Sequence, residues 1–407
     1  MTTYFEDDQI HLHLGEALSV LQTLETESVD CVVTSPPYFG LRDYGVPPTD
    51  WPELTYSPMP GSDPIIVPAM SCPLGLEPDV VAYVGHLRLI LLEVNRVLAK
   101  DGTLWLNLGD SWASSAGWGR GGGSRLEGGQ KSLQQNTPRK SDFGVRRKNL
   151  IGIPWRVVFA MQGDGWILRS DVIWNKPNPM PENVKDRPTS SYEHVFLLSK
   201  EPKYFYDGAA IAEQATGRSS GNGFNRPEQI GRGGPGSDSE WVGRPQLRRA
   251  MELAKEHNLT EEHFAAIRAV GMNDAGKAKK IQGGSGNNAE ETTRLAAEAK
   301  TALGGYYREF LTGATKNARD VWTISTKPFP EAHFAAMAPA LATRCITAGC
   351  KPGGTVLDPF SGSGTTGMVA LEQGRRYVGI ELSQEYLDLS LRTRFANGII
   401  SDTGVSA

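Results

Sequence analysis

A short stretch after an apolar run carries residue types that could hold a flat, amine-bearing substrate. Ser35-Pro36-Pro37-Tyr38 follows Val29–Val33, whose apolar character predicts a buried strand of a parallel sheet. The two prolines end the strand and fix the turn, because each ring locks φ and removes an N–H. The Ser35 hydroxyl and the Pro36 carbonyl can accept hydrogen bonds from an exocyclic amino group, and the Tyr38 ring can stack on a base. The alternative is an ordinary turn before an aromatic core residue.

A glycine-rich turn near the other end of the chain has the form of a nucleotide-cofactor site. Gly362, Gly364 and Gly367 follow a predicted strand over Thr355–Phe360 and precede a predicted helix. Glycines at a helix N-terminus allow a ligand to approach the backbone closely. The next predicted strand ends at Glu381, where a carboxylate can bind the hydroxyls of a ribose.

The order of these two features along the chain separates two interpretations. The glycines also satisfy G-x-G-x-x-G, which a nicotinamide-binding fold would use. Such a fold needs several more βα units after its glycine turn, and only a short tail follows this one. The other strands must therefore come from the N-terminal half, where we predict Asp30–Thr34, Thr103–Leu108, Asp171–Asn175 and His194–Ser199. The substrate strand comes first and the cofactor unit last.

In that order, the two motifs resemble those of S-adenosylmethionine-dependent amino-group DNA methyltransferases of the permuted β class, the N4-cytosine/N6-adenine family. Residues 35–38 match the family's [DNS]-P-P-[YFW] motif, and residues 358–366 match its D-P-F-x-G-x-G-T-T loop. Residues 173–179 and 191–194 also resemble family segments. The resemblance covers blocks of roughly 1–205 and 318–395. It implies an α/β, Rossmann-like methyltransferase fold with a circularly permuted, mostly parallel sheet and an inserted, mainly helical or loop-rich target-recognition region.

The resemblance also implies roles for individual residues, and we expect no metal among them. The implied catalytic residues are Ser35, Pro36, Pro37 and Tyr38. The implied ligands of S-adenosyl-L-methionine are Asp358, Phe360, Gly362, Gly364, Thr365 and Glu381, with His333 and Phe334 from a segment, 327–334, that resembles the element beside the cofactor. Family members often have Gly-Asp near the start, where this chain has Gly15-Glu16. Glu16 could reach the adenine amino group, or it could simply be an acid in the first turn of a helix over 16–24.

Composition and motif order predict three segments. Residues 1–206 form the catalytic half of the methyltransferase domain, 207–317 the target-recognition region, and 318–407 the cofactor-binding half. Residues 111–150 contain eight Lys or Arg, two acids and eight glycines. We expect a mobile basic loop over about 111–148 that closes on phosphates; a merely solvated loop is the alternative. The candidate DNA-binding residues are Arg120, Arg125, Arg139, Lys140, Arg146, Arg147, Lys148, Arg248 and Arg249.

The middle segment changes in texture along its length. Residues 216–245 are rich in Gly, Arg, Ser, Asn and Pro and show no apolar period. Helices are predicted over Leu247–His257, Glu261–Val270 and Ala289–Leu303. The first two could form a helix-turn-helix reader of DNA or a plain packing pair, and the sequence leaves both open.

Composition narrows the class of protein. The chain has 407 residues, a net charge of −4, and four cysteines without C-x-x-C spacing, so a zinc site is not expected. It has no Pro-Cys dipeptide, which disfavours the covalent mechanism of cytosine-C5 enzymes. The sequence contains no run of about 18 apolar residues, so we predict no membrane span. The acidic N-terminus does not resemble a signal peptide. We expect a cytoplasmic protein of bacterial, archaeal or phage origin.

The predicted reaction is direct in-line methyl transfer to a base flipped out of duplex DNA. Family members with Ser at the first motif position are more often cytosine-N4 enzymes, and those with Asp more often adenine-N6 enzymes. Ser35 therefore favours N4 of cytosine, with adenine N6 as the alternative. An RNA or protein-glutamine methyltransferase is disfavoured by motif order, and a catalytically inactive DNA-binding protein is the remaining alternative. The sequence leaves open the recognition site, a companion restriction endonuclease and a homodimer.

Overall fold

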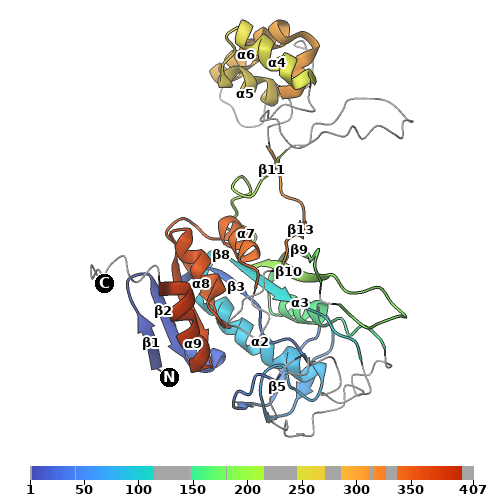
Figure 1. Ribbon diagram of the computed structural model, residues 1–407, viewed down its shortest axis with the longest axis vertical. Helices are drawn as coiled ribbons and strands as arrows, with labels where there is room; N and C mark the ends of the chain where they lie inside the picture. The colour runs from blue at the N-terminus through green and yellow to red at the C-terminus, as the bar shows by residue number, and fades with distance from the viewer. Residues whose placement is uncertain are drawn as a thin grey trace. The chain divides into compact units, whose positions relative to one another are not determined.

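The computed structural model describes residues 2–41, 43–113, 146, 148–179, 181–214, 245–270, 286–310, 315–326 and 337–396. The chain divides into two compact units (Figure 1). Unit 1 comprises Met1–Ile211 and Arg319–Ala407, and unit 2 comprises Ala212–Ala318. Unit 1 is thus built from both ends of the chain, as the separated motifs require.

A nine-stranded sheet forms the centre of unit 1. Its spatial order is β1 (Thr2–Glu6), β2 (Ile10–Leu14), β15 (Arg376–Glu381), β14 (Thr355–Asp358), β3 (Val29–Thr34), β8 (Leu98–Leu108), β10 (Tyr192–Ser199), β9 (Ile167–Asn175) and β13 (Val321–Thr323). The run from β2 to β8 is parallel, whereas β1 and β10 pair antiparallel with their neighbours. The C-terminal strands lie between N-terminal ones, so the predicted permuted, mostly parallel α/β fold is confirmed.

Helices cover both faces of this sheet because its central strands are apolar on both faces. Leu104, Leu106 and Leu108 of β8 are buried with α1 (Ala17–Leu21), α2 (Val80–Val97) and α3 (Ile153–Gly163). Between them, Trp105 points to the other face, where α7 (Pro339–Gly349) packs so closely that a Cβ on Gly349 would lie 2.2 Å from the indole nitrogen. This two-residue alternation is the pattern of a strand buried between two helical layers.

The C-terminal helices pack against the first strands. Figure 1 shows the red elements α8 (Thr365–Glu372) and α9 (Gln384–Ser390) beside the blue strands β1 and β2. The Tyr4 hydroxyl of β1 donates a hydrogen bond to Asp388 of α9. The π-helical turn η2 (Leu391–Phe395) continues α9 and buries Phe395 against Tyr377.

The segment of the chain between the Pro-Pro turn and α2 forms two small antiparallel ladders. They pair β4 (Thr49–Trp51) with β7 (Met70–Cys72) and β5 (Leu54–Tyr56) with β6 (Ile65–Val67). Trp51, Tyr56 and Val67 are buried in the same core as α2. The short strands were not predicted, because three-residue strands give no measurable alternation.

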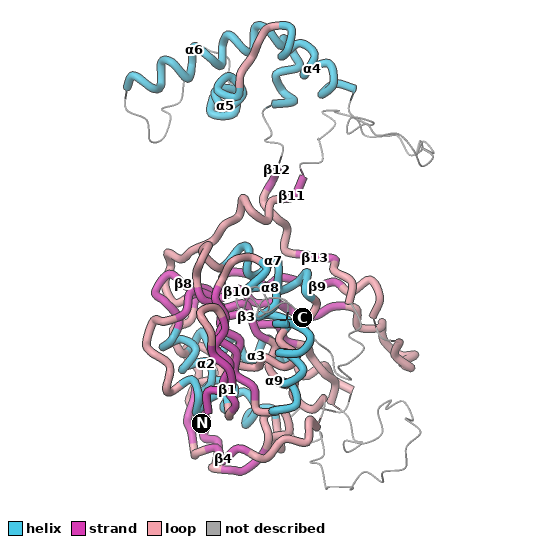
Figure 2. Tube along the Cα trace, turned by 60° about the vertical axis from the view of Figure 1, so that its left-hand side comes forward, coloured by secondary structure: helices cyan, strands magenta, loops and turns pink. Residues whose placement is uncertain are grey.

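Unit 2 contains the three helices predicted for the middle segment, α4 (Pro245–Glu256), α5 (Glu261–Val270) and α6 (Gly286–Leu303), followed by the 3-10 turn η1 (Gly304–Phe310) (Figure 2). The short strands β11 (Glu213–Gln214) and β12 (Thr315–Lys316) pair where the unit begins and ends. Phe264 of α5 stacks on Phe310 at 4.4 Å between ring centroids. Ala250, Ala254, Ile267, Ala299 and Leu303 complete this small core. No helix among the described residues combines the length and apolarity needed to cross a bilayer.

Candidate active site

The Pro-Pro turn lies at the carboxyl end of β3 and is held from below by hydrogen bonds to its backbone. The Tyr83 hydroxyl of α2 donates to the Pro37 carbonyl at 2.9 Å. The Gly40 N–H donates to the Gly75 carbonyl at 2.8 Å. Gly75 has φ +93°, and a Cβ there would lie 3.2 Å from the Tyr38 carbonyl, so a glycine allows the two segments to meet. The turn is therefore rigid before any ligand binds.

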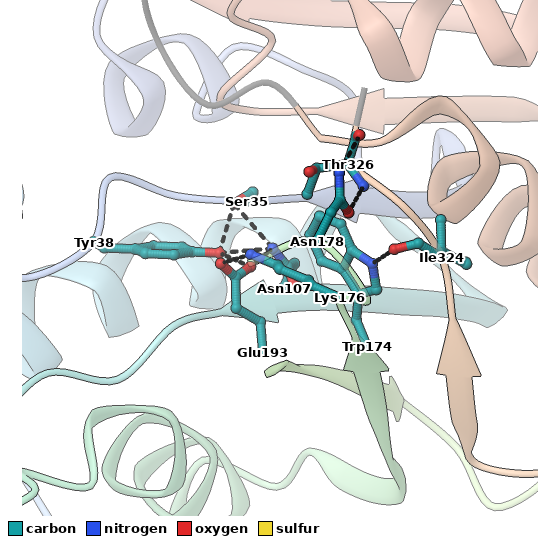
Figure 3. Close-up of polar contacts among 9 residues, drawn as sticks. All are labelled: Ser35, Tyr38, Asn107, Trp174, Lys176, Asn178, Glu193, Ile324 and Thr326. Carbon is teal, nitrogen blue, oxygen red and sulfur yellow. Dashed lines mark hydrogen bonds and ion pairs between the residues drawn. The ribbon is translucent and has the colours of Figure 1, made fainter. Parts of the chain in front are cut away.

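A polar cluster gathers around the side chains of the turn (Figure 3). The Tyr38 hydroxyl donates to Glu193 Oε2 at 2.8 Å. Asn107 Nδ2 donates to the Tyr38 oxygen at 2.6 Å and to Glu193 Oε2 at 2.9 Å. The Ser35 hydroxyl donates to the Tyr38 oxygen at 3.3 Å. Lys176 forms an ion pair with the other oxygen of Glu193. Five side chains from four places in the sequence thus converge at the turn.

Sheet register explains the convergence. Asn107 is near the end of β8, and Glu193 is near the start of the antiparallel strand β10. In the next ladder Glu193 pairs with Trp174 of β9, and Lys176 follows that strand. The sequence had marked residues 173–179 and 191–194 as family-like without giving Lys176 or Glu193 a role. Asn107 was missed, although it is the one polar side chain in an otherwise apolar run, and that interruption was the available signal.

Burial keeps the Tyr38 phenol protonated. Desolvation, and then the nearby Glu193 charge, raise the pKa of Tyr38 well above its ordinary value. The ring packs so closely on Gly109 that a Cβ there would lie 2.6 Å from a ring carbon. Tyr38 is therefore fixed as a hydrogen-bond donor to Glu193.

The segment after β9 is tied to the chain after β13. Trp174 Nε1 donates to the Ile324 carbonyl at 2.9 Å. Asn178 and Thr326 exchange two hydrogen bonds, from Asn178 Nδ2 to the Thr326 carbonyl at 3.2 Å and from the Thr326 N–H to Asn178 Oδ1 at 3.1 Å (Figure 3). The Lys176 ammonium lies 4.3 Å from the centroid of the Trp174 ring, a cation–π contact. These bonds fix the position of Lys176.

A buried carboxylate links the catalytic strand to the glycine loop. Asp358, at the end of β14, accepts hydrogen bonds from Thr34 Oγ1 at 2.7 Å, Thr366 Oγ1 at 2.8 Å and the Phe360 N–H at 3.0 Å. Burial raises the pKa of Asp358 to about 6. Both of its oxygens are occupied by protein donors, so in this structure Asp358 braces the loop against the residue that precedes Ser35.

Glu381 is held across the same loop. Its carboxylate accepts from the Gly362 N–H at 2.8 Å and the Ser383 N–H at 2.9 Å, and burial raises its pKa. Gly364 has φ +77°, and a Cβ there would meet Ser390 at 2.8 Å. Thr365 Oγ1, at the start of α8, is buried and has no partner among the described residues. An unpartnered hydroxyl beside a glycine turn at a helix N-terminus fits a binding site for a polar cofactor.

Glu16 lies beside this loop but is engaged locally. The Gly15 N–H donates to the Glu381 carbonyl at 3.0 Å, which places the start of α1 beside the end of β15. Glu16 is the N-cap of α1 and accepts from the Leu18 and Ser19 N–H groups, each at 2.8 Å. Its contact with a cofactor stays a prediction.

The base of the basic loop is pinned together. Trp112 and Leu150 form an isolated β-bridge, and the Ala113 N–H donates to the Asn149 carbonyl at 2.8 Å. The Arg187 guanidinium carbon lies 3.4 Å from the centroid of the Trp112 ring. The bridge and the Arg187 contact thus anchor Trp112 at the base of the loop.

Many predicted contact residues lie outside the described residues. These are His333, Phe334, Arg120, Arg125, Arg139, Lys140, Arg147 and the side chain of Arg248. Arg146 is exposed. Lys148 pairs with Asp186 at 2.5 Å, and Arg249 pairs with Glu252 at 3.2 Å; both pairs are exposed. Exposed pairs of this kind exchange readily with phosphate, so both cations stay candidates for DNA contact.

A second polar cluster supports the turn from behind. Glu77 accepts from the Gly75 N–H at 2.8 Å and pairs with His86 Nδ1 at 3.1 Å, with both side chains fully buried. Cys72 lies with these two residues, with potential ligand atoms all within 4.8 Å of one another. These side-chain types could ligate a metal, and the expectation of no metal stays a prediction.

The permuted sheet, with a rigid Pro-Pro turn and a glycine loop at neighbouring carboxyl ends, defines an α/β methyltransferase domain. The DNA methylase family of N6/N4 type matches residues 29–392. This chain belongs to that family and is a DNA methyltransferase.

Two type II methyltransferases support the assignment over nearly the whole chain. The type II methyltransferase M.Cfr9I of Citrobacter freundii is 35% identical over 377 residues, which are 93% of this chain and 85% of that protein. The type II methyltransferase M.SmaI of Serratia marcescens is 35% identical over 377 residues, 93% of this chain and 88% of that protein. Among solved structures, the PvuII DNA methyltransferase (cytosine-N4-specific) has a TM-score of 0.46 at 15% identity, covering 99% of this chain and 90% of that one.

Proposed function

We propose that this protein methylates the N4 amine of cytosine at a specific site in duplex DNA, within a type II restriction-modification system. The observation that carries the proposal is the junction between β3 and β14. There the 2.7 Å bond from Thr34 to Asp358 fixes the serine-bearing turn beside the glycine loop. A substrate amine at the turn and a methyl donor at the loop would therefore meet without a large movement of the protein.

The methyl donor is S-adenosyl-L-methionine, which supplies an electrophilic methyl sulfonium when bound. The glycine loop at Gly362 and Gly364, with the unpartnered hydroxyl of Thr365, forms its cradle. Glu381, whose carboxylate spans the loop, faces the ribose in this proposal. Phe360 and Glu16, and also His333 and Phe334, complete the proposed site. Asp358 also braces the loop, and its predicted contact with the cofactor belongs to the same proposal.

The turn orients the acceptor amine. An exocyclic amine is a weak nucleophile because its lone pair is delocalised into the ring. Ser35 Oγ and the Pro36 carbonyl each accept a hydrogen bond from one N–H of this amine. These two bonds draw the nitrogen towards tetrahedral geometry. Tyr38 stacks on the flipped base. Positioning supplies most of the acceleration, and no covalent enzyme intermediate forms.

Serine at the first position of the turn supports cytosine N4, and adenine N6 remains the alternative. Unit 2 is the proposed target-recognition region, and the basic loop between Trp112 and Leu150 closes on the DNA backbone. A cognate endonuclease, a homodimer and a cytoplasmic location beside the genome belong to the same proposal.

A transfer assay tests this function. Purified protein is incubated with methyl-labelled S-adenosyl-L-methionine and unmethylated duplex DNA of varied sequence, with RNA and bulk protein as parallel acceptors. Label should enter duplex DNA alone. Label in RNA or protein alone would overturn the proposal, as would the absence of transfer to any acceptor.

A further inference from the structure

The polar cluster at the turn has a fixed hydrogen-bond direction. Glu193 is a carboxylate paired with Lys176, and a carboxylate can only accept. The Tyr38 hydroxyl therefore uses its single proton to donate a hydrogen bond to Glu193, at 2.8 Å. With that proton committed, the Tyr38 oxygen can act towards its other neighbours only as an acceptor.

Asn107 reinforces the direction. The same carboxylate forces the amide nitrogen of Asn107 to face the cluster, where it donates to Glu193 at 2.9 Å and to Tyr38 at 2.6 Å. The Asn107 contact with Ser35 Oγ is much longer, 3.5 Å. Asn107 thus spends its donors on Tyr38 and Glu193.

Ser35 comes at the end of this series. Its hydroxyl donates a hydrogen bond to the Tyr38 oxygen at 3.3 Å, a separation that can shorten when a substrate orders the site. The lone pairs of Ser35 then face the remaining space. Asn107 Oδ1 is also buried without a partner among the described residues. The cluster therefore presents Ser35 Oγ to a ligand as a hydrogen-bond acceptor.

We propose that the series Glu193–Tyr38–Ser35 is a specificity device that makes Ser35 an obligatory hydrogen-bond acceptor, so that the pocket admits bases with an amino group and rejects bases with a keto group at that position (Figure 3). Cytosine and adenine each present an N–H donor. Uracil and thymine present a carbonyl oxygen at that position. This oxygen would face the lone pairs of Ser35, so that two acceptors would oppose each other with no hydrogen between them. Tyr38 and Glu193 are positioning residues in this device, acting through Ser35, and the device rests on the proposed function.

Removing one hydroxyl tests the device. Tyr38→Phe keeps the stacking ring but frees the Ser35 proton to point at the substrate. The methylated site is first mapped on DNA of varied sequence. Two duplexes then carry this site with either cytosine or uracil at the target position, and their Kd values are measured by fluorescence anisotropy without cofactor. The cost of the G·U mismatch is common to all variants, so it cancels when the cytosine-to-uracil ratio of Kd is compared between them.

The preference for cytosine over uracil, expressed as the ratio of the two Kd values, should be roughly tenfold or more weaker in Tyr38→Phe than in the wild type. This is the size expected when Ser35 is no longer held as an acceptor and can also donate a hydrogen bond. Glu193→Gln, which removes the charge that orients Tyr38, should lower the preference as well. Tyr192→Phe removes an exposed hydroxyl next to Glu193 in the chain and should leave it unchanged.

Three outcomes bear on the device. An unchanged ratio in Tyr38→Phe, with wild-type protein that methylates cytosine, would overturn it and leave the proposed function standing. A lowered ratio in Tyr192→Phe as well would show a general loss of fit and would also overturn it. Wild-type protein without transfer to DNA would instead contradict the proposed function.

Discussion

In the proposed function, Ser35 is the residue on which the chemistry depends, because its oxygen is the side-chain acceptor that the turn presents. Its partners were only partly visible in the sequence. The Ser-Pro-Pro-Tyr motif is local, so four adjacent residues reveal it. Asn107 and Glu193 come from two strands and Lys176 follows a third, and only the antiparallel register of β10 brings them to the turn. A single sequence without pairing information gives no such register.

Replacing Ser35 by Ala tests its role. We expect turnover to fall by about 10²–10³-fold, the usual cost of removing one oriented polar group from a reacting centre. The affinity for S-adenosyl-L-methionine, measured by calorimetry, should stay near that of the wild type because the glycine loop is untouched. Turnover at the wild-type level would refute the role of Ser35.

At the scale of elements, the junction of β3 with β14 matters most. The sequence correctly predicted both strands, and it predicted Asp358 as a cofactor ligand because the D-P-F motif implied it. In the structure its oxygens are occupied by Thr34 and Thr366. The hydroxyl of Thr34 lies 324 positions away in sequence, so no local pattern could show that Asp358 joins two elements.

The raised pKa of Asp358 predicts a pH dependence of stability. Its folded pKa, about 6, lies above its ordinary value of 3.8, so the folded protein binds this proton more tightly than the unfolded chain. The contribution of this group to the free energy of unfolding is therefore greatest below about pH 4 and declines as the pH rises through 6. The change is up to about 3 kcal/mol at about 1.4 kcal/mol per pKa unit.

The comparison of wild type with Asp358→Asn isolates this group from the other buried carboxyls. Chemical denaturation at pH 4.5 and pH 7 should show a larger loss of stability on raising the pH in the wild type than in the variant. Equal losses in the two proteins would show that Asp358 does not titrate in this range. Thr34→Val and Thr34→Ser, which remove and retain the donor, provide the matched pair for the hydrogen bond itself.

The whole molecule consists of two units with different demands on the sequence. The fold of unit 1 could be predicted from the sequence because two local motifs indicate its chemistry and its central strands are apolar. Unit 2 was recognisable only as helices, since its small core of alanines with Phe264 and Phe310 carries no motif. We propose that it is the target-recognition region because it falls, in the sequence, between the two segments of unit 1.

DNA binding at this scale should depend on salt through the basic loop. We expect a triple variant, Arg139→Gln, Lys140→Gln and Arg146→Gln, to bind DNA more weakly. The slope of log affinity against log salt should become shallower by about 0.9 for each lost phosphate contact. Cofactor affinity should not change. Arg249→Gln, in unit 2, serves as a single-charge comparison, and an unaltered slope in the triple variant would remove these residues from the interface.

The most direct test of the central claim is the chemical identity of the methylated nucleoside. Unmethylated duplex DNA is incubated with the protein and S-adenosyl-L-methionine, digested to nucleosides and analysed by mass spectrometry. The account predicts N4-methylcytosine, absent from a parallel reaction with Ser35→Ala. N6-methyladenine would contradict the base assignment drawn from Ser35, and DNA without any modified base would contradict the account as a whole.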